Sequence, residues 1–335
     1  MMVNNIKKVI KNKAMILILL VLLFIISFFL SVGNGAVKIS PAEIVKSIFF
    51  KDNNTNYQII WNVRLPRTLV AALVGVCLSL SGVILQGIMK NPLAGPNIIG
   101  VSSGAGLFAL IILILFPQYY YLVPMGAFCG ALFATLIIYI LAWKGGAQPT
   151  RLVLAGVAVS SLFSAGTNAL MTFFPDRVQG VLNFMVGGLS AVTWEDFKMI
   201  VPYTILGLCL VIFLPNKLNI LMLGDEMATG LGLNVEKTRF LFIILSSLLA
   251  GSAVSVVGLL GFVGLIVPHI GRVIIGSDHR FLFPGIILLG SSTVMLCDTL
   301  ARTLFAPVEI PVGIIMSVLG GPFFLYLLKL RGENS

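Results

Sequence analysis

The feature that most constrains this chain is its series of long apolar stretches. The hydrocarbon core of a bilayer is about 30 Å thick, so an α-helix needs roughly 20 apolar residues to cross it. By that criterion the sequence predicts ten membrane-spanning segments. They are residues 14–32, 67–89, 97–116, 120–143, 151–174, 197–214, 238–257, 259–275, 281–304 and 311–329. The expected fold is an all-α polytopic membrane protein, with some of its helices short or broken.

Composition agrees with a single membrane domain over residues 1–335. Hydrophobic residues make up 58% of the chain and charged residues only 10%, whereas soluble domains carry about 25% charged residues. The first segment, 14–32, follows several lysines. We interpret it as a membrane anchor and not as a signal peptide, because its apolar stretch exceeds the roughly 7–15 residues of a signal core.

The distribution of Lys and Arg predicts the orientation. With the N-terminus inside, the cytoplasmic flanks of the segments carry about twice as many basic residues as the outer flanks, in line with the positive-inside rule. Ten spans then place both termini in the cytoplasm. These flanks account for the net charge of +10. Since no basic cluster interleaves with aromatic residues, binding of nucleic acid is not predicted.

Sequence patterns for catalysis or metal binding are missing. The four cysteines are scattered singly, and His269 and His279 belong to no ligand cluster, so no disulfide framework, metal site or cofactor is predicted. The chain contains no G-x-x-x-x-G-K-[ST] phosphate loop. We therefore expect a subunit that is not an enzyme, with any ATP bound by another polypeptide.

Charged residues in or beside the apolar segments are candidate functional residues. The stretch NVRLPRTLVAALVG places Arg64 and Arg67 at the outer end of the second span, and Asp298 and Arg302 lie four apart on one face of the ninth. Because charges in a membrane are costly and tend to pair, Asp298 and Arg302 are predicted to form an intramembrane charge pair. Two interpretations of Arg64 and Arg67 stay open: anchors that snorkel to the headgroups, or a fork that recognises carboxylates of a partner.

Glycine and proline interrupt the apolar pattern in two regions. These are residues 89–106, MKNPLAGPNIIGVSSGAG, and residues 256–280, VVGLLGFVGLIVPHIGRVIIGSDHR. Broken helices occur in membranes where the backbone packs in protein or lines a cavity. In the first outer loop, the sequence SPAE beginning at Ser40 predicts a short helix with a capping box.

The longest cytoplasmic connection, residues 215–238, has a one-sided apolar pattern. A predicted helical turn begins at Asp225, and apolar residues recur every four positions around it. A helix on the lipid surface is one interpretation. Its acidic polar side instead favours docking into a groove of a soluble protein, because lipid-surface helices usually have basic polar faces. The candidate residues are Leu223, Gly224, Asp225, Glu226, Met227, Ala228, Gly230, Leu231 and Gly232.

Together these stretches resemble the permease family of ABC importers for iron-siderophores, haem and cobalamin. The elements that carry the resemblance are RLPRTLVAALVG, SGVILQGIMKNPLAGPNIIGVSSGAG, GDEMATGLGLN, GFVGLIVPHIGR with SDHR, and EIPVGIIMSVLGGPFF. The resemblance covers residues 36–331. It implies ten helices per permease, a second permease copy, two cytoplasmic ATPase subunits and a substrate-binding protein on the outer side.

The resemblance also implies roles for particular residues. Arg64 and Arg67 match the family's RLPR and Arg302 matches its third docking arginine, so all three are expected to meet glutamates of the binding protein. The segment 223–232 is expected to sit in a cleft of the ATPase. The inner gate is expected at the start of the fifth span, where this chain differs from relatives with Ser and Thr. The gate residues here are Gln148, Pro149 and Thr150.

The sequence therefore predicts the permease of an ATP-driven importer in a bacterial cytoplasmic membrane, moving a ferric siderophore by alternating access. Haem and cobalamin stay open as substrates, and the second permease copy is either identical or paralogous. An ion-coupled secondary transporter would need titratable groups near the midplane. For that role the chain offers essentially Asp298 alone.

Overall fold

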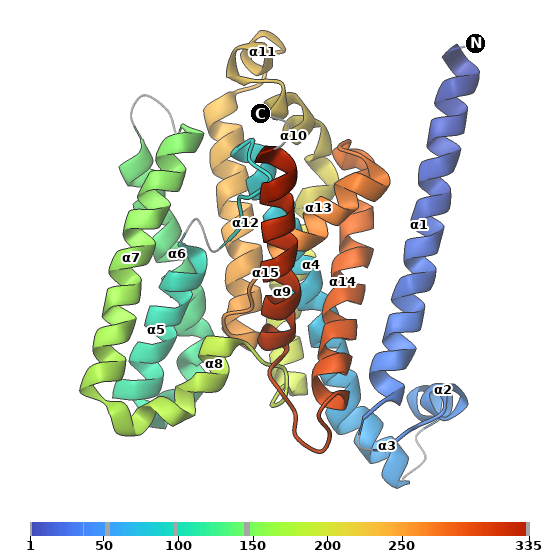
Figure 1. Ribbon diagram of the computed structural model, residues 1–335, viewed down its shortest axis with the longest axis vertical. Coiled ribbons are helices and arrows are strands. Elements are labelled where there is room, and N and C mark those ends of the chain that lie inside the picture. Colours follow the sequence, from blue (N-terminus) through green and yellow to red (C-terminus); the bar gives the residue numbers. More distant parts are fainter. Residues whose placement is uncertain (1, 36, 51–53, 97–99, 144–147, 333–335) are drawn as a thin grey trace.

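The computed structural model of the chain describes residues 2–35, 37–50, 54–96, 100–143 and 148–332 (Figure 1). Ten helices in these ranges correspond in order to the ten predicted spans. They are α1 (Met2–Gly33), α4 (Leu65–Ile88), α5 (Val101–Leu115), α6 (Val123–Ala142), α7 (Pro149–Phe173), α9 (Trp194–Phe213), α12 (Val235–Val257), α13 (Val263–Ile275), α14 (His279–Thr303) and α15 (Val312–Gly332). Among the described residues, seven helices are long and apolar enough to cross a membrane, and α5, α13 and the Val312–Tyr326 part of α15 are shorter apolar helices. The predicted all-α polytopic membrane fold is confirmed.

Capping residues set where several helices begin, which explains small differences from the predicted boundaries. Asn234 Oδ1 accepts a hydrogen bond from Lys237 N at 3.0 Å, and α12 begins directly after this N-cap. Thr193 and Asp196 form a capping box at the start of α9. Such caps satisfy the free N–H groups of the first turn and are polar. The predicted ranges 197–214 and 238–257, drawn from apolarity alone, therefore begin three residues after the helices α9 and α12 do.

Short helices connect the spans. They are α2 (Pro41–Phe49), α3 (Thr55–Ile59), the π-helical turn η1 (Ile60–Arg64), the 3₁₀ turns η2 (Pro117–Leu122) and η3 (Pro175–Val181), α8 (Leu182–Val186), α10 (Pro215–Met222) and α11 (Asp225–Gly230). The capping box predicted from SPAE is confirmed. Glu43 N donates to Ser40 Oγ at 3.3 Å, and Ser40 N donates to Glu43 Oε2 at 3.2 Å.

Helix α4 lies at the centre of the bundle and contacts α9, α12, α13 and α14 (Figure 1). Nearly all of its residues are buried, as expected for a helix that is apolar on every side. Helices α5, α6 and α7 pack together on one side of the centre. On the other side α1 packs against α14.

Glycines bring α4 unusually close to two neighbours. A Cβ atom on Gly82 would lie 2.0 Å from the carbonyl oxygen of Gly264 in α13, and one on Gly75 would lie 2.2 Å from that of Gly290 in α14. Small residues of this kind let helix backbones approach in membranes, where packing replaces the hydrophobic effect. The sequence places Arg67 eight residues before Gly75 and Asp298 eight residues after Gly290. The antiparallel contact of α4 and α14 therefore puts both charges at one level.

The break between α12 and α13 confirms the second predicted interruption. Gly258, at φ +76°, ends α12, and Phe262, at φ +65°, begins α13 from a left-handed conformation. The chain around α8 lies against this break, because Leu259 N donates to Phe184 O at 2.9 Å. Backbone groups freed by the break are thus satisfied inside the protein, as the membrane requires.

The first predicted interruption lies partly outside the described residues, which omit 97–99. Gly100, at φ +66°, precedes α5. The helix is therefore shorter than the predicted span 97–116.

The two ends of the bundle differ in what they carry. The start of α1 and the end of α15 lie at the same end as α11, whereas α2 and α3 lie at the opposite end (Figure 1). The positive-inside rule assigns the first of these ends to the cytoplasm. We call the other the outer end.

Candidate functional site

A cluster of charged side chains joins three elements at the outer end. Arg67 of α4 forms a two-pronged contact with Asp298 of α14, with Nε 3.0 Å from Oδ2 and Nη2 2.9 Å from Oδ1. Its remaining nitrogen, Nη1, donates to Glu309 Oε2 at 2.8 Å, in the connection before α15. The Asp298 side chain is 1% exposed and that of Glu309 is 45% exposed. One guanidinium therefore spans from the buried interior to the surface.

The predicted pair of Asp298 and Arg302 is present but is the weaker of two. Arg302 Nε lies 3.7 Å from Asp298 Oδ2, farther than the nitrogens of Arg67. Arg302 Nη2 instead donates to the carbonyl and hydroxyl oxygens of Ser31 in α1. Ser31 Oγ lies 2.9 Å from the hydroxyl of Thr68 in α4. Arg302 thereby fastens α1 to the bundle.

Arg64 closes the end of α1. Its guanidinium donates to the carbonyl oxygens of Val32 at 2.8 Å and Gly33 at 3.1 Å, and also to that of Val37. The last carbonyls of a helix have no partners within the helix, and a cation there also complements the helix dipole. Arg64, which lies in η1, therefore caps the C-terminal end of α1 with its side chain.

The three predicted docking arginines lie at the outer end, but their side chains do not face outward. Arg64, Arg67 and Arg302 are 5%, 6% and 6% exposed, and each guanidinium has partners within the chain. Neither interpretation made from the sequence, headgroup anchor or exposed fork, anticipated this arrangement. Docking through these residues stays a prediction. In this conformation a partner at the surface meets the Glu309 carboxylate before it meets Arg67.

The predicted apolar ridge in the cytoplasmic connection is confirmed. Leu223, Met227 and Leu231 are 58%, 62% and 60% exposed on and beside α11, while Ala228 is fully buried. Gly232, at φ +81°, follows the helix. We call the three exposed side chains the coupling ridge, after the predicted docking on an ATPase, which stays a prediction. Helix α11, which carries Met227, lies at the cytoplasmic end of the bundle (Figure 1).

Asp225 fastens α11 to the rest of the chain. Both of its carboxylate oxygens lie 2.9 Å from Arg239 Nη2 in α12, and Lys90 Nζ lies 3.7 Å from Oδ1. Arg239 is only 1% exposed and also bonds Glu236 at 3.1 Å. The sequence interpretation, which placed Asp225 on the acidic polar side of the cytoplasmic connection, missed this contact because Arg239 lies in the next helix.

The ionisation of Asp225 follows from these contacts. Partial burial raises its pKa, but hydrogen bonding and charge from Arg239, helped by Lys90, outweigh burial and lower the pKa below its ordinary value. A carboxylate with a lowered folded-state pKa contributes stability above its unfolded pKa and loses it as pH falls through the folded value. The contact between α11 and α12 is therefore fully formed at neutral pH.

The predicted gate residues lie at the start of α7. Gln148 is the N-cap position and Pro149 the first residue of the helix, and the Gln148 side chain makes no capping hydrogen bond. Gln148 and Thr150 are exposed. Residues 144–147, directly before them, lie outside the described residues. A gating role for these three positions stays a prediction.

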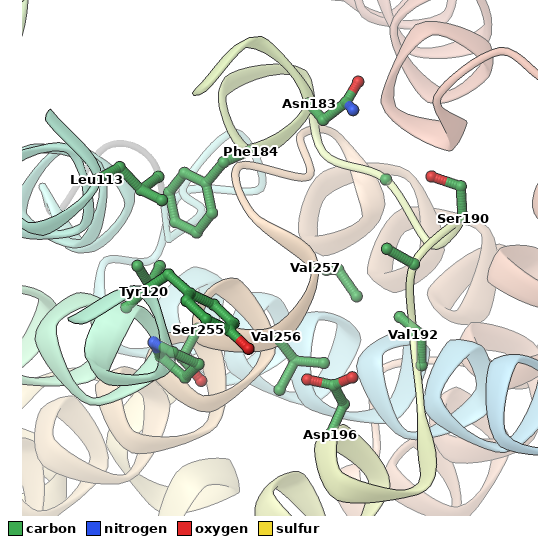
Figure 2. A pocket seen from close by; sticks show the side chains of 14 residues that line it. Leu113, Tyr120, Asn183, Phe184, Ser190, Val192, Asp196, Ser255, Val256 and Val257 are labelled. Atoms are coloured by element: carbon green, nitrogen blue, oxygen red, sulfur yellow. The ribbon is translucent and has the colours of Figure 1, made fainter. Parts of the chain in front are cut away.

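A cavity of about 320 Å³ lies near the outer end, beside α8 and the end of α12. Figure 2 shows Phe184 and Leu113 on one side of it and Asp196 on the other. The Asp196 carboxylate accepts the Thr193 N–H at 2.8 Å and so is held by its cap. No sequence pattern points to this cavity, because its lining comes from elements far apart in the chain. Among the described residues, no group of three or more His, Cys, Asp or Glu side chains is placed to hold a metal ion.

Comparison with known proteins supports a transport role. Residues 22–330 match the FecCD transport family. The chain is 41% identical over 320 residues to the Fe(3+)-citrate import system permease protein YfmE of Bacillus subtilis, covering 95% of this chain and 96% of that protein. It is 39% identical over 337 residues to the hemin transport system permease protein HmuU of Yersinia pestis, covering 97% and 98%. A solved structure described as an inward-facing metal-chelate type ABC transporter superposes with a TM-score of 0.85 at 31% identity, covering 94% of this chain and 99% of that one.

Proposed function

This chain belongs to the FecCD transport family, and we propose that it is the permease through which an ATP-driven importer carries a ferric siderophore across the bacterial cytoplasmic membrane. The observation that carries the proposal is an exposed coupling ridge on a membrane bundle that resembles import permeases over nearly its full length. Similarity to a ferric citrate permease favours an iron(III) chelate. Similarity to a hemin permease keeps haem as the second candidate.

The proposed assembly has the parts that such a permease requires. Two copies of the permease domain, identical or paralogous, would enclose the path. Two cytoplasmic ATPase subunits would seat the coupling ridges, and a binding protein would deliver the chelate at the outer end. Movement would follow alternating access, with the gate residues Gln148, Pro149 and Thr150 at the inner end of the path.

Docking of the binding protein is the part of the proposal that concerns the outer arginines. We propose that a glutamate of the binding protein replaces Glu309 at Arg67 Nη1. Glu309 is the contact that gives way most easily, since an ion pair with a half-exposed carboxylate is worth only about 0–1 kcal/mol. Arg64 and Arg302 would hold the outer ends of α1 and α14 in the shape that the partner meets.

The experiment that tests the proposed function is uptake by liposomes that contain the permease, its ATPase and its binding protein. We expect ATP-dependent uptake of radioactive iron supplied as ferric citrate or a ferric hydroxamate, with no uptake when the ATPase is omitted. The permease alone should hydrolyse no ATP. Hydrolysis by the isolated chain, or iron uptake without ATPase, contradicts the proposal; uptake of haem in place of iron chelates corrects the substrate.

The coupling ridge makes a separate prediction. Met227→Asp places a charge where the ridge would pack into the ATPase, and an unpaired charge in a packed interface costs several kcal/mol. We expect the ATPase to co-purify poorly with this variant and uptake to fall to background. Met227→Leu keeps an apolar side chain and is the matched control. Normal co-purification and uptake of the Asp variant would show that the ridge lies on lipid and not on a protein.

A further inference from the structure

A hydrogen-bonded junction joins α10 to the turn between α13 and α14. Asn219 of α10 uses both ends of its amide there. Its Nδ2 donates to Asp278 Oδ1 at 2.9 Å, and its Oδ1 accepts the backbone N–H of His279 at 3.1 Å. The same Oδ1 lies 2.6 Å from His279 Nδ1, which places the ring proton on Nδ1. We call these three residues the α10–α14 junction.

Each part of the junction is held in place by its surroundings. His279 is fully buried, and its ring packs edge-on against Phe283 at 5.3 Å. Its other ring nitrogen, Nε2, is buried without a hydrogen-bond partner among the described residues. The hydrogen bond from Nδ1 to the Asn219 amide is therefore the polar contact that sets the orientation of the ring. Asp278 is at once the N-cap of α14, accepting Arg280 N at 3.1 Å.

The helix that carries Asn219 connects directly to the coupling ridge. Only Leu223 and Gly224 separate α10 from α11. Leu218 and Leu221 of α10 are fully buried. Leu218 packs against Gly87 of α4 so closely that a Cβ atom added to Gly87 would lie 2.8 Å from Leu218 Cδ1. These apolar contacts hold α10 against the bundle, but because they are not directional they do not determine its position along or about its own axis. The hydrogen bonds of Asn219 are directional and do determine it.

On the far side of the junction lies the broken region. The turn that carries Asp278 follows α13, whose N-cap is Phe262 and whose Gly264 meets Gly82 of α4. The Phe262 ring also fills the space beside Gly320 of α15. A displacement of this turn would therefore shift α13 against α4, at Gly82, and against α15, at Gly320.

We propose that Asn219 is a positioning residue that passes displacement of the coupling ridge to α13 and α14. The proposal rests on the proposed function. Coupling between distant sites is carried by packed side chains, hydrogen-bond networks and rigid secondary elements, and the α10–α14 junction supplies a hydrogen-bonded link of this kind. An amide suits the task because one end must donate to a carboxylate while the other accepts from two N–H groups. Among the described residues, Asn219 is the one residue of α10 whose side chain forms hydrogen bonds to another element.

The test compares variants in the complete transporter in liposomes, measuring iron taken up as ferric citrate per ATP hydrolysed. Asn219→Asp keeps the acceptor for His279 but sets a second carboxylate against Asp278. We expect uptake per ATP to fall by roughly five- to tenfold, as is common for residues along a coupling network, with the ATPase still co-purifying. Asn216→Asp is the matched control, because Asn216 lies on the same helix and is exposed. It should leave the ratio unchanged.

Exchange of the two side chains separates the junction from general stability. In Asn219→Asp combined with Asp278→Asn, the new amide at 278 can donate to the new carboxylate at 219, and Asn is as good an N-cap as Asp. We expect this double variant to regain most of the lost ratio. A ratio equal to wild type in Asn219→Asp overturns the proposal, as does failure of the exchange to restore it in a correctly assembled transporter. Lack of uptake by the wild type, in contrast, refutes the proposed function.

Discussion

Asp298→Ala is expected to destabilise the folded chain by about 3–5 kcal/mol, because it leaves the Arg67 guanidinium buried without its principal partner. Arg67 is 6% exposed and donates three of its four side-chain hydrogen bonds to Asp298. The removed carboxylate also leaves Arg302 without its nearest acidic group. Thermal unfolding of the purified protein in detergent measures the loss. A melting temperature equal to that of the wild type would show that the pair is not structural.

Two further variants separate stability from docking. Glu309→Gln is the matched control, since it changes the exposed partner of the same guanidinium and should leave the melting temperature nearly unchanged. Because it removes the internal carboxylate that competes for Arg67 Nη1, it should also bind the binding protein more tightly. Arg67→Met with Asp298→Leu replaces the whole pair by apolar side chains and should regain stability. Unaltered binding by both variants would exclude Arg67 from docking.

Gly82→Ala is expected to be among the most damaging single-methyl changes in the bundle. The added Cβ would lie 2.0 Å from the Gly264 carbonyl oxygen and 2.7 Å from its Cα. Both are backbone atoms, so relief requires α4 and α13 to separate. Overpacking usually costs about 1–3 kcal/mol and occasionally more, and we expect the upper end here. Since Gly264 lies just after the break between α12 and α13, uptake should fall along with the melting temperature.

The matched control for this change is Gly230→Ala. Gly230 ends α11, and no atom lies within 4 Å of where its Cβ would be. In an exposed helical position alanine is favoured over glycine by up to about 1 kcal/mol, so the melting temperature should stay level or rise. If Gly82→Ala proves as mild as Gly230→Ala, the close approach of α4 to α13 does not exist in the folded protein.

Much of the fold could be predicted because helix formation depends on nearby residues. Apolar length identified the ten spans, and the spacing of Leu223, Met227 and Leu231 identified the coupling ridge. Gly258 marked the break between α12 and α13, where a left-handed turn was needed. The boundaries were less accurate where polar caps such as Asn234 extend a helix beyond its apolar part.

The candidate site was predicted less completely, because its contacts join distant parts of the chain. The sequence paired Asp298 with Arg302, four residues away, on helical spacing alone. The structure adds Arg67, 231 residues from Asp298 in sequence, and gives it the closer contact. Asn219 carried no motif and was not singled out, since its role depends on a turn about sixty residues further along the chain.

By itself, the sequence determined that this chain is a polytopic helical membrane protein with a cytoplasmic ridge and charged residues at the ends of its spans. Only the tertiary structure decided what those charges contact. Arg64 and Arg67 would face water if the outer end of α4 stood free, but α1, α14 and the segment carrying Glu309 enclose it. The physical reason is one of range: a helix forms from contacts within a turn or two, whereas a buried ion pair forms only after several helices have packed.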